Sequence, residues 1–202
     1  MSDLTIDAAR SATATTPASE VLRRIALCQA RLTRGELAEL VELIAGQRQL
    51  WRPVVRHDSE KRWYARLHRA RNVEVWLIGW ERGQDTRFHD HGGSSGAFAV
   101  VQGSLSEEYG HLERWHGVMR RNHHAGTARS FGPEYIHNLG NTAEHPATSV
   151  HAYSPPLSTM TYYRTEPDRL VPYETVVTAG PEPEIDIVKA AKRAGYFGEV
   201  MP

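Results

Sequence analysis

After Trp51 the chain is a succession of short apolar and aromatic stretches, each separated from the next by turn residues. Segments rich in Val, Trp, Tyr and Phe alternate with Gly, Pro, Asn and Asp. Many short strands at regular spacing are typical of an all-β sandwich or barrel. We expect strands within residues 63–68, 73–80, 96–109, 111–119, 148–154 and 160–164.

The first 50 residues have a different texture. Residues 1–17 are rich in Ser, Thr and Ala without periodicity, which predicts a disordered tail. Residues 19–31 place their apolar side chains broadly on one side of a helix. A second helix is predicted after Thr33, because Thr33 and Glu36 have the spacing of a capping box and apolar residues then repeat at helical intervals. We expect these two helices to pack against one side of the barrel.

The length of 202 residues favours one domain with a sizeable core. We therefore expect a single, mainly β domain over residues 18–202. Its helical part would cover 18–50 and its barrel about 51–180, with a C-terminal strand and helix over 181–202.

Charge and cysteine content exclude several classes of protein. The 24 basic and 24 acidic residues balance, so nothing indicates a nucleic-acid or anionic-membrane partner. The single cysteine, Cys28, permits no disulfide within the chain. There is no secretory signal at the N-terminus and no apolar run approaching the roughly 18 residues of a membrane span. We expect a soluble cytoplasmic monomer.

Two histidines one residue apart, His89 and His91, are the first candidates for chemistry. On a strand, residues two apart share a face, so both imidazoles would point the same way. Imidazole nitrogen suits Zn, Fe, Cu and Ni, and two such groups aimed at one point begin a metal site. The spacing alone also fits a solvent-exposed His-Asp-His turn.

The flanking residues resemble the two motifs of the cupin superfamily, whose members are small β-barrels of the jelly-roll type. Gly83, His89, His91 and Gly103 stand as in the first motif. The segment FGPEYIHNLGN, residues 131–141, resembles the second motif and supplies His137 from a distant strand.

This chain has Gly96 where the cupin pattern normally carries a glutamate ligand. The departure leaves three neutral histidines and no anionic protein ligand. An octahedral ion would keep three open positions and its full dipositive charge, which favours an anionic, chelating substrate together with O2. Fe(II) is the common metal that binds thiolate and activates O2.

Two further rows of side chains are predicted to point into the barrel. Ser149, His151 and Tyr153 alternate along one strand, so they share a face and form a polar row ending at Tyr153. They would otherwise be packed structural residues with satisfied hydrogen bonds. Tyr64 and Arg66 also share a face, and an inward arginine would need an anion such as a substrate carboxylate. From spacing alone, Arg66 also fits an ordinary surface residue.

Taken together, several motifs of the chain resemble those of cysteine dioxygenase. The matching segments are YAR (64–66), HDH (89–91), QGSLSE (102–107), YIHNLGN (135–141) and SVHAYSPP (149–156). The resemblance implies a non-haem Fe(II) enzyme, with one iron per chain, that adds both atoms of O2 to the sulfur of L-cysteine and gives cysteine sulfinic acid.

By position, the resemblance also assigns roles to individual residues. It implies that Arg66 binds the substrate carboxylate, assisted by Tyr64 and by the Tyr153 hydroxyl. It implies that His151 orients Tyr153, with Ser149 behind it. The implied iron ligands are His89, His91 and His137.

One departure concerns a covalent modification. In the animal enzymes a cysteine occupies the position of Gly96 and forms a thioether with the tyrosine that matches Tyr153. Gly96 has no side chain and Cys28 lies far upstream, so this chain resembles the bacterial members that carry glycine there. We expect an unmodified Tyr153.

The remaining histidines lack a partner pattern and are interpreted as surface or loop residues: His57, His68, His111, His116, His123, His124 and His145. Three other functions are compatible with parts of the pattern. A dioxygenase for 3-mercaptopropionate is the nearest, although such relatives commonly carry glutamine in place of Arg66. A zinc or manganese cupin isomerase would normally keep the carboxylate that Gly96 lacks. A non-catalytic cupin that binds a small ligand is the third.

Overall fold

The computed structural model describes residues 30–110 and 117–178. Within this described part, two helices precede the strands, α2 (Arg34–Gly46) and α3 (Arg48–Trp51). The predicted capping box is present, since the Thr33 side chain accepts from the Glu36 backbone N–H and the Glu36 carboxylate accepts from the Thr33 N–H. Four predicted features lie outside the described residues: the 1–17 tail, nearly all of the 19–31 helix, the 111–116 part of one strand, and the 181–202 strand and helix.

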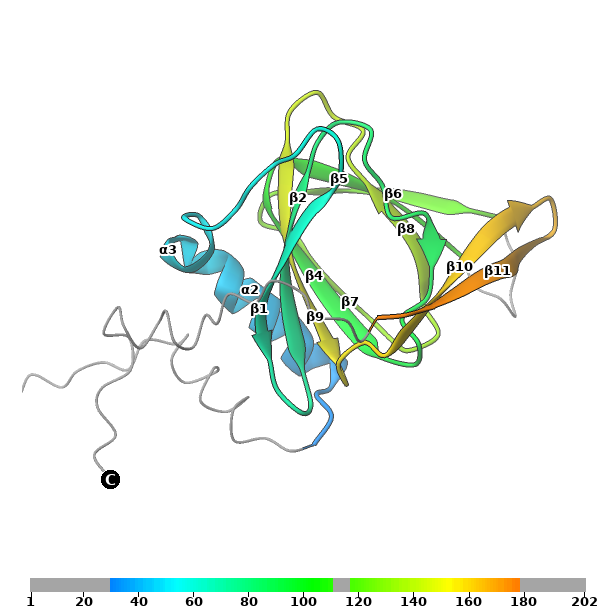
Figure 1. Cartoon of the computed structure of the whole chain (residues 1–202), viewed down its shortest axis with the longest axis horizontal. Helices are drawn as coiled ribbons and strands as arrows, with labels where there is room; N and C mark the ends of the chain where they lie inside the picture. Colours follow the sequence, from blue (N-terminus) through cyan, green and yellow to red (C-terminus); the bar gives the residue numbers. More distant parts are fainter. Residues whose placement is uncertain (1–29, 111–116, 179–202) are drawn as a thin grey trace, which may run out of the picture.

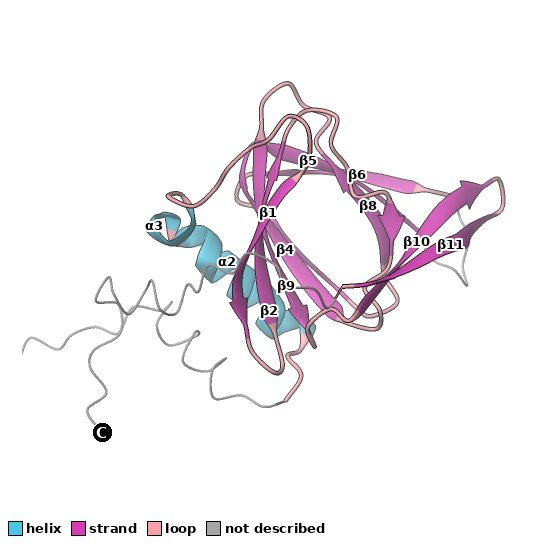
Figure 2. Cartoon of the chain, in the orientation of Figure 1, coloured by secondary structure: helices cyan, strands magenta, loops and turns pink. Residues whose placement is uncertain are grey.

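Two antiparallel sheets curve around a common interior (Figures 1 and 2). The five-stranded sheet contains, in spatial order, β1 (Trp63–Arg69), β2 (Glu74–Trp80), β9 (Ala147–Ser154), β4 (Ser95–Gln102) and β7 (Ala128–Phe131). The six-stranded sheet contains β11 (Arg169–Val177), β10 (Thr159–Glu166), β3 (Phe88–His89), β8 (Ile136–Gly140), β5 (Ser104–Gly110) and β6 (Met119–His124). The predicted fold class, a mainly β barrel with helices before it, is confirmed.

Helix α2 covers the outer face of the five-stranded sheet (Figure 1). Its buried residues Leu37, Val41 and Ile44 belong to one apolar cluster with Val150 and Ala152 of β9. This contact explains why every residue of β9 is buried. Alternate side chains of β9 pack against the helix, and the others face the barrel interior.

The strand pattern differs from the sequence prediction in two ways. The segment expected as one stretch over 96–109 is divided into β4 and β5 at Gly103, whose φ of 71° is a conformation that glycine adopts readily. Strands β6, β7 and β11 were not predicted. β6 and β11 are rich in exposed polar residues, and β7 has only four residues, so none of them carries the apolar signal on which the prediction rested.

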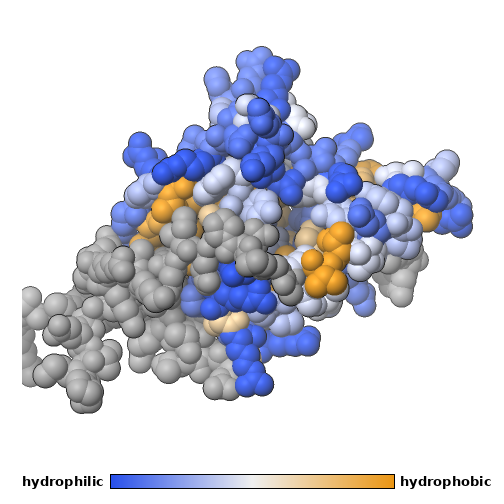
Figure 3. All heavy atoms as spheres, viewed as in Figure 1, coloured by the Kyte–Doolittle hydropathy of each residue, from blue (hydrophilic) through white to orange (hydrophobic). Residues whose placement is uncertain are grey.

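Most hydrophobic side chains of the described residues are buried or partly buried. Figure 3 shows a mainly hydrophilic face, with hydrophobic atoms in small, separate patches. The large hydrophobic residues that remain exposed in the described part are Tyr64, Tyr173 and Val177. Within the described residues, no helix is both long and apolar enough to span a membrane.

Candidate metal centre

Three histidines converge inside the barrel. His89 on β3 lies directly opposite His137 on β8, so strand pairing brings two imidazoles together across the six-stranded sheet. His91 joins them from just beyond the end of β3, where the chain turns. A ligand nitrogen from each of the three lies within 4.8 Å of the others, and all three residues are buried. The predicted grouping of His89, His91 and His137 is therefore present.

The hydrogen bonds of these histidines leave nitrogens available for a metal. The Nδ1 atom of His89 lies 2.9 Å from the Arg87 carbonyl and donates to it. The Nδ1 atom of His137 lies 2.8 Å from Glu107 Oε1 and likewise donates. In both residues Nε2 is then an unprotonated acceptor. Among the described residues, neither ring nitrogen of His91 has a partner in hydrogen-bonding geometry, although the Tyr135 backbone is close by.

Burial keeps His89 and His91 neutral. Burial, followed by the proximity of His137, lowers the pKa of His89 well below its usual value. Burial and the neighbouring His89 and His137 do the same for the pKa of His91. Neutral imidazole is the form that binds metal ions. Three converging imidazoles, one of them with orphaned buried nitrogens, fit a single metal ion.

A buried carboxylate behind His137 was not identified from the sequence. Glu107 on β5 is fully buried and accepts from His137, from the Tyr135 hydroxyl at 2.9 Å, and from His123 Nε2 at 2.8 Å. Arg121 lies 3.5 Å from its second oxygen. Glu107 therefore links three strands and fixes the orientation of one candidate ligand, as carboxylates behind metal-bound histidines commonly do.

Glu107 is held as an anion. Burial alone would raise the pKa of this carboxyl, but the hydrogen bonds from His123 and His137 outweigh it and place the pKa well below its usual range. Position 96 is a glycine and offers no carboxylate to a metal. The negative charge of Glu107 nevertheless lies close to the three-histidine set, because Glu107 is hydrogen-bonded to the candidate ligand His137.

The prediction that His123 is a surface or loop residue is wrong. It lies on β6, is buried, and packs edge-on against Phe98 with ring centroids 5.0 Å apart. The prediction holds for His124 and His145, which are exposed. His57 is a half-buried loop residue and His68 is half-buried on β1, while His111 and His116 lie outside the described residues.

The predicted polar row on β9 forms a hydrogen-bonded chain. Ser149 Oγ lies 2.8 Å from His151 Nε2, and His151 Nδ1 lies 3.3 Å from the Tyr153 hydroxyl. The Trp80 indole N–H, which can only donate, bonds Ser149 Oγ at 2.8 Å. Ser149 Oγ accepts from Trp80, and His151 Nε2 is the described acceptor within reach of the hydroxyl proton of Ser149, so we assign that proton to the bond with His151. His151 Nδ1–H then donates to Tyr153, and the Tyr153 hydroxyl proton is free to point into the pocket.

Burial also sets the protonation of this chain of residues. It lowers the pKa of His151 to about 3, with the nearby His137 and Arg62 acting in the same direction. Burial, followed by the charge of Glu74, raises the pKa of Tyr153 far above its usual value. At neutral pH the imidazole is therefore uncharged and Tyr153 is a hydrogen-bond donor.

The buried neutral His151 predicts a pH-dependent stability. Between pH 6.5 and 3 the unfolded chain binds a proton at this residue and the folded chain does not, so the free energy of unfolding falls as the pH falls. The expected loss is about 1.4 kcal/mol per pH unit below 6.5 for one such histidine. Urea unfolding of metal-free protein from pH 7 to pH 5 measures it. His151→Gln should give a shallower slope, and equal slopes would contradict the assignment.

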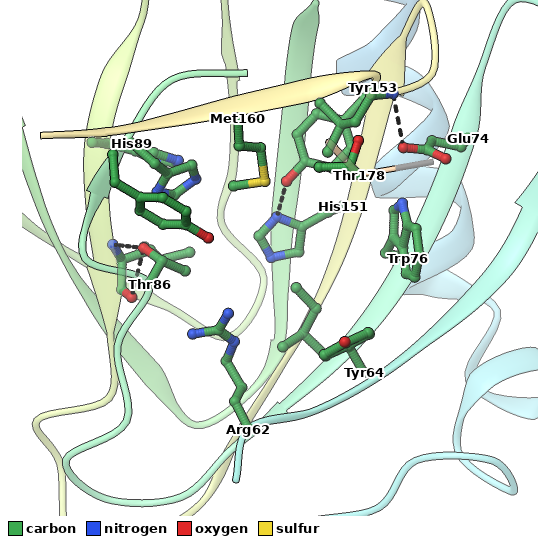
Figure 4. Close-up of a pocket in the computed structure, with 15 residues that line it drawn as sticks. Arg62, Tyr64, Glu74, Trp76, Thr86, His89, His151, Tyr153, Met160 and Thr178 are labelled. Atoms are coloured by element: carbon green, nitrogen blue, oxygen red, sulfur yellow. Dashed lines mark hydrogen bonds between the residues drawn. The ribbon is translucent and has the colours of Figure 1, made fainter. Parts of the chain in front are cut away.

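A pocket of about 230 Å³ lies beside the histidines, a size that suits a small molecule (Figure 4). Tyr64 and Tyr153 line it, as do His89 and His137. Its other described lining residues are Arg62, Glu74, Trp76, Ile78, Thr86, Leu139, His151, Leu157, Met160, Tyr162 and Thr178.

Arg66 is not among those described lining residues. It is only 7% exposed, so it is not an ordinary surface arginine. Its guanidinium lies over the Trp76 ring, 5.4 Å from the centroid. The sequence did not single out Arg62, which does line the pocket.

Gly96 lies directly opposite Tyr153 in the pairing of β4 with β9. A Cβ atom at this position would lie 2.4 Å from the Phe131 ring and 3.0 Å from Tyr153 Cδ1. The buried Phe131 ring therefore occupies the space beside Tyr153 that a side chain at position 96 would need.

Together these features define a cupin-type barrel that holds a three-histidine metal site and a small pocket beside it. The chain belongs to the cysteine dioxygenase type I family, since a sequence model of that family matches residues 5–166. Membership of this family and the three-histidine set indicate a metal-dependent thiol dioxygenase with a single non-haem metal ion.

Several solved structures resemble the barrel. One, from Thermus thermophilus, is 18% identical, with 52% of this chain and 93% of that chain covered and a TM-score of 0.46. A Klebsiella pneumoniae protein with a double-stranded β-helix domain is 18% identical, with 52% and 80% covered and a TM-score of 0.44. A cupin superfamily protein from Desulfitobacterium hafniense is 9% identical, with 52% and 86% covered and a TM-score of 0.43.

Proposed function

We propose that this protein is an Fe(II)-dependent cysteine dioxygenase that converts L-cysteine and O2 to cysteine sulfinic acid. Both oxygen atoms are added to the thiol sulfur, which supplies all four electrons, so no external reductant is needed. The observation that carries the proposal is the convergence of three buried histidines beside a small pocket in a chain of this family.

The proposed iron ligands are His89, His91 and His137. When bound, Fe(II) supplies coordination of the substrate thiolate and activation of O2. Imidazole binds a metal ion in its neutral form, so three histidine ligands would leave the charge of the ion uncompensated and favour an anionic substrate over a neutral one. Glu107 positions His137, while the Arg87 carbonyl positions His89.

Tyr153 is proposed to donate a hydrogen bond to the reacting group. Its raised pKa keeps the proton on the phenol, and the chain from Trp80 through Ser149 and His151 leaves that proton directed into the pocket. The imidazole of His151 holds the phenol in place, and Ser149 fixes the imidazole tautomer. With Gly96 opposite, Tyr153 is proposed to act without a thioether bond.

Tyr153→Phe is expected to lower kcat by roughly 10-fold to 100-fold, because it removes one positioned donor and little volume. Iron content should stay at the wild-type level, since Tyr153 is not a proposed ligand. Steady-state O2 uptake and metal analysis measure the two quantities. Ser149→Ala should give a smaller loss in the same direction, because it disturbs only the tautomer of His151. Unchanged kcat in Tyr153→Phe would contradict the proposed role.

The test of the proposed function is O2 uptake by iron-loaded protein, with product analysis for cysteine sulfinic acid. We expect turnover with L-cysteine and slower turnover with 3-mercaptopropionate. A preference for 3-mercaptopropionate would overturn the choice of substrate. Zinc as the bound metal, with no thiol-dependent O2 uptake after iron loading, would overturn the proposed reaction.

A further inference from the structure

His91 differs from the other two candidate ligands in what holds it. His89 and His137 are each fixed twice, by pairing with each other across two strands and by a hydrogen bond at Nδ1. His91 lies beyond the end of β3, and among the described residues neither of its ring nitrogens has a partner in hydrogen-bonding geometry. Its ring packs against those of Phe131 and Tyr153, with centroids 4.6 Å and 5.3 Å away. The reach of this imidazole toward the metal therefore depends on the backbone that carries it.

Asp90 holds that backbone on both sides of His91. Its Oδ1 atom accepts from the Gly92 N–H at 3.0 Å and from the Thr161 N–H of β10 at 3.1 Å. Its own N–H donates to the Thr161 carbonyl at 2.9 Å. Its Oδ2 atom accepts from the Tyr163 hydroxyl, also on β10, at 2.7 Å. One side chain thus connects the turn that follows β3 to the neighbouring strand of the six-stranded sheet.

The turn itself is built from glycine. Gly92 and Gly93 have φ angles of 56° and 83°, a region that glycine adopts at little cost. A Cβ atom at Gly92 would overlap Thr159 of β10, so the turn lies directly against that strand. Two adjacent glycines supply no side chain that could hold the turn. The hydrogen bonds of Asp90 to the turn and to β10 supply that support instead.

We propose that Asp90 is a positioning residue that keeps the imidazole of His91 aimed at the metal. The inference rests on the proposed function only in taking the three histidines as metal ligands. Asp90 stands between His89 and His91, so strand alternation directs its side chain away from the centre and toward β10. It acts through the backbone of the turn and touches neither metal nor substrate. The role needs oxygen acceptors at these positions and does not need the negative charge.

Loss of the Asp90 carboxylate should therefore weaken metal binding. Asp90→Ala removes all three hydrogen bonds that the side chain accepts, so Fe(II) affinity should fall by roughly 10-fold to 100-fold, the usual effect of losing a group that orients a ligand. Asp90→Asn keeps an oxygen that can accept from both backbone N–H groups, so its affinity should stay within about 3-fold of wild type. An effect of charge on the metal would weaken binding in both variants alike.

Asp58→Ala is the matched control. Asp58 is also partly buried, and its Oδ1 atom likewise accepts from two backbone N–H groups, those of Glu60 and Lys61. The control therefore removes a comparable contact from a loop that carries none of the three candidate ligands. Its Fe(II) affinity should equal that of wild type.

The test is anaerobic competition for Fe(II) between the full chain and a chromophoric chelator, together with the visible absorption of Co(II)-loaded protein. The cobalt spectrum reports the set of metal ligands without any turnover. At saturating Co(II), Asp90→Ala should have an altered spectrum, whereas Asp90→Asn and Asp58→Ala should keep that of wild type. A residue that only supports the fold would lower the melting temperature and leave the spectrum of the folded, metal-saturated protein unchanged.

Three outcomes would overturn the assignment: wild-type affinity and spectrum in Asp90→Ala, a loss in Asp90→Asn as large as in Asp90→Ala, and an equal loss in Asp58→Ala. If Asp90→Ala fails to fold, Tyr163→Phe decides the question. It removes only the bond to Oδ2 and should weaken Fe(II) binding by roughly 2-fold to 10-fold, and unchanged binding would then overturn the assignment. Failure of the proposed function has a different signature, since wild-type protein would bind both metals and form no sulfinate.

Discussion

Replacing His89 with alanine is expected to abolish both metal binding and turnover. His89 is one of three donors whose ligand atoms lie within 4.8 Å of one another. Its Nδ1 atom is hydrogen-bonded to the Arg87 carbonyl, which leaves Nε2 as the nitrogen that can bind the metal. Loss of residues that only orient a ligand already weakens metal binding by about 10-fold to 100-fold, so loss of a ligand should cost more. Metal analysis after iron loading and thiol-dependent O2 uptake measure the two effects.

His124→Ala is the matched control for this prediction. It makes the same chemical change at an exposed histidine on β6, so iron content and turnover should match wild type. Substantial turnover in His89→Ala, or equal losses in the two variants, would contradict the three-histidine assignment.

Replacing Glu107 with glutamine is expected to be the most damaging change outside the ligands. It removes a buried anion that serves His123, His137 and Tyr135 together. Breaking a buried charged pair costs about 3–5 kcal/mol, and losing the partner of a metal-bound histidine weakens metal binding by about 10-fold to 100-fold. Denaturant unfolding and competition with a chelator measure the two losses.

Glu108→Gln provides the control for Glu107, because it makes the same substitution at the next residue. Glu108 is partly exposed and pairs with the exposed Arg120, and such pairs contribute about 0–1 kcal/mol. If Glu107→Gln were as stable and bound metal as tightly as Glu108→Gln, the structural role of Glu107 would be disproved.

The sequence predicted the parts of the site that depend on local geometry. Strand alternation was enough to group Ser149, His151 and Tyr153, since a strand places every second side chain on one face. The hydrogen bonds along this row follow from that geometry. His89 and His91 were paired by the same rule, although β3 ends at His89 and the following turn brings His91 to the centre.

The sequence could not predict contacts that depend on which strands are neighbours. Glu107 shares a face of β5 with Leu105, but alternation does not reveal that β6 and β8 flank this strand. That arrangement turns His123 from an apparent surface residue into a buried partner of Glu107. Likewise, alternation predicts that Arg62 and Arg66 point to the same side of the strand. Their different neighbours depend on how β1 pairs with β2, which the sequence does not show.

Gly96 illustrates how sequence and structure inform each other. The sequence established that position 96 offers neither a carboxylate to a metal nor a sulfur to Tyr153. The structure adds that Gly96 and Tyr153 are cross-strand partners and that the Phe131 ring fills the adjacent space. The space that a side chain at position 96 would need is therefore filled by the Phe131 ring and is not an empty cavity.

Isotope labelling tests the central claim most directly. Iron-loaded protein is supplied with L-cysteine and 18O2, and the product is analysed by mass spectrometry. The account predicts cysteine sulfinic acid in which both added oxygen atoms carry the label, formed one for each O2 consumed. Disulfide in place of sulfinate, or sulfinate whose oxygen comes from water, would contradict it.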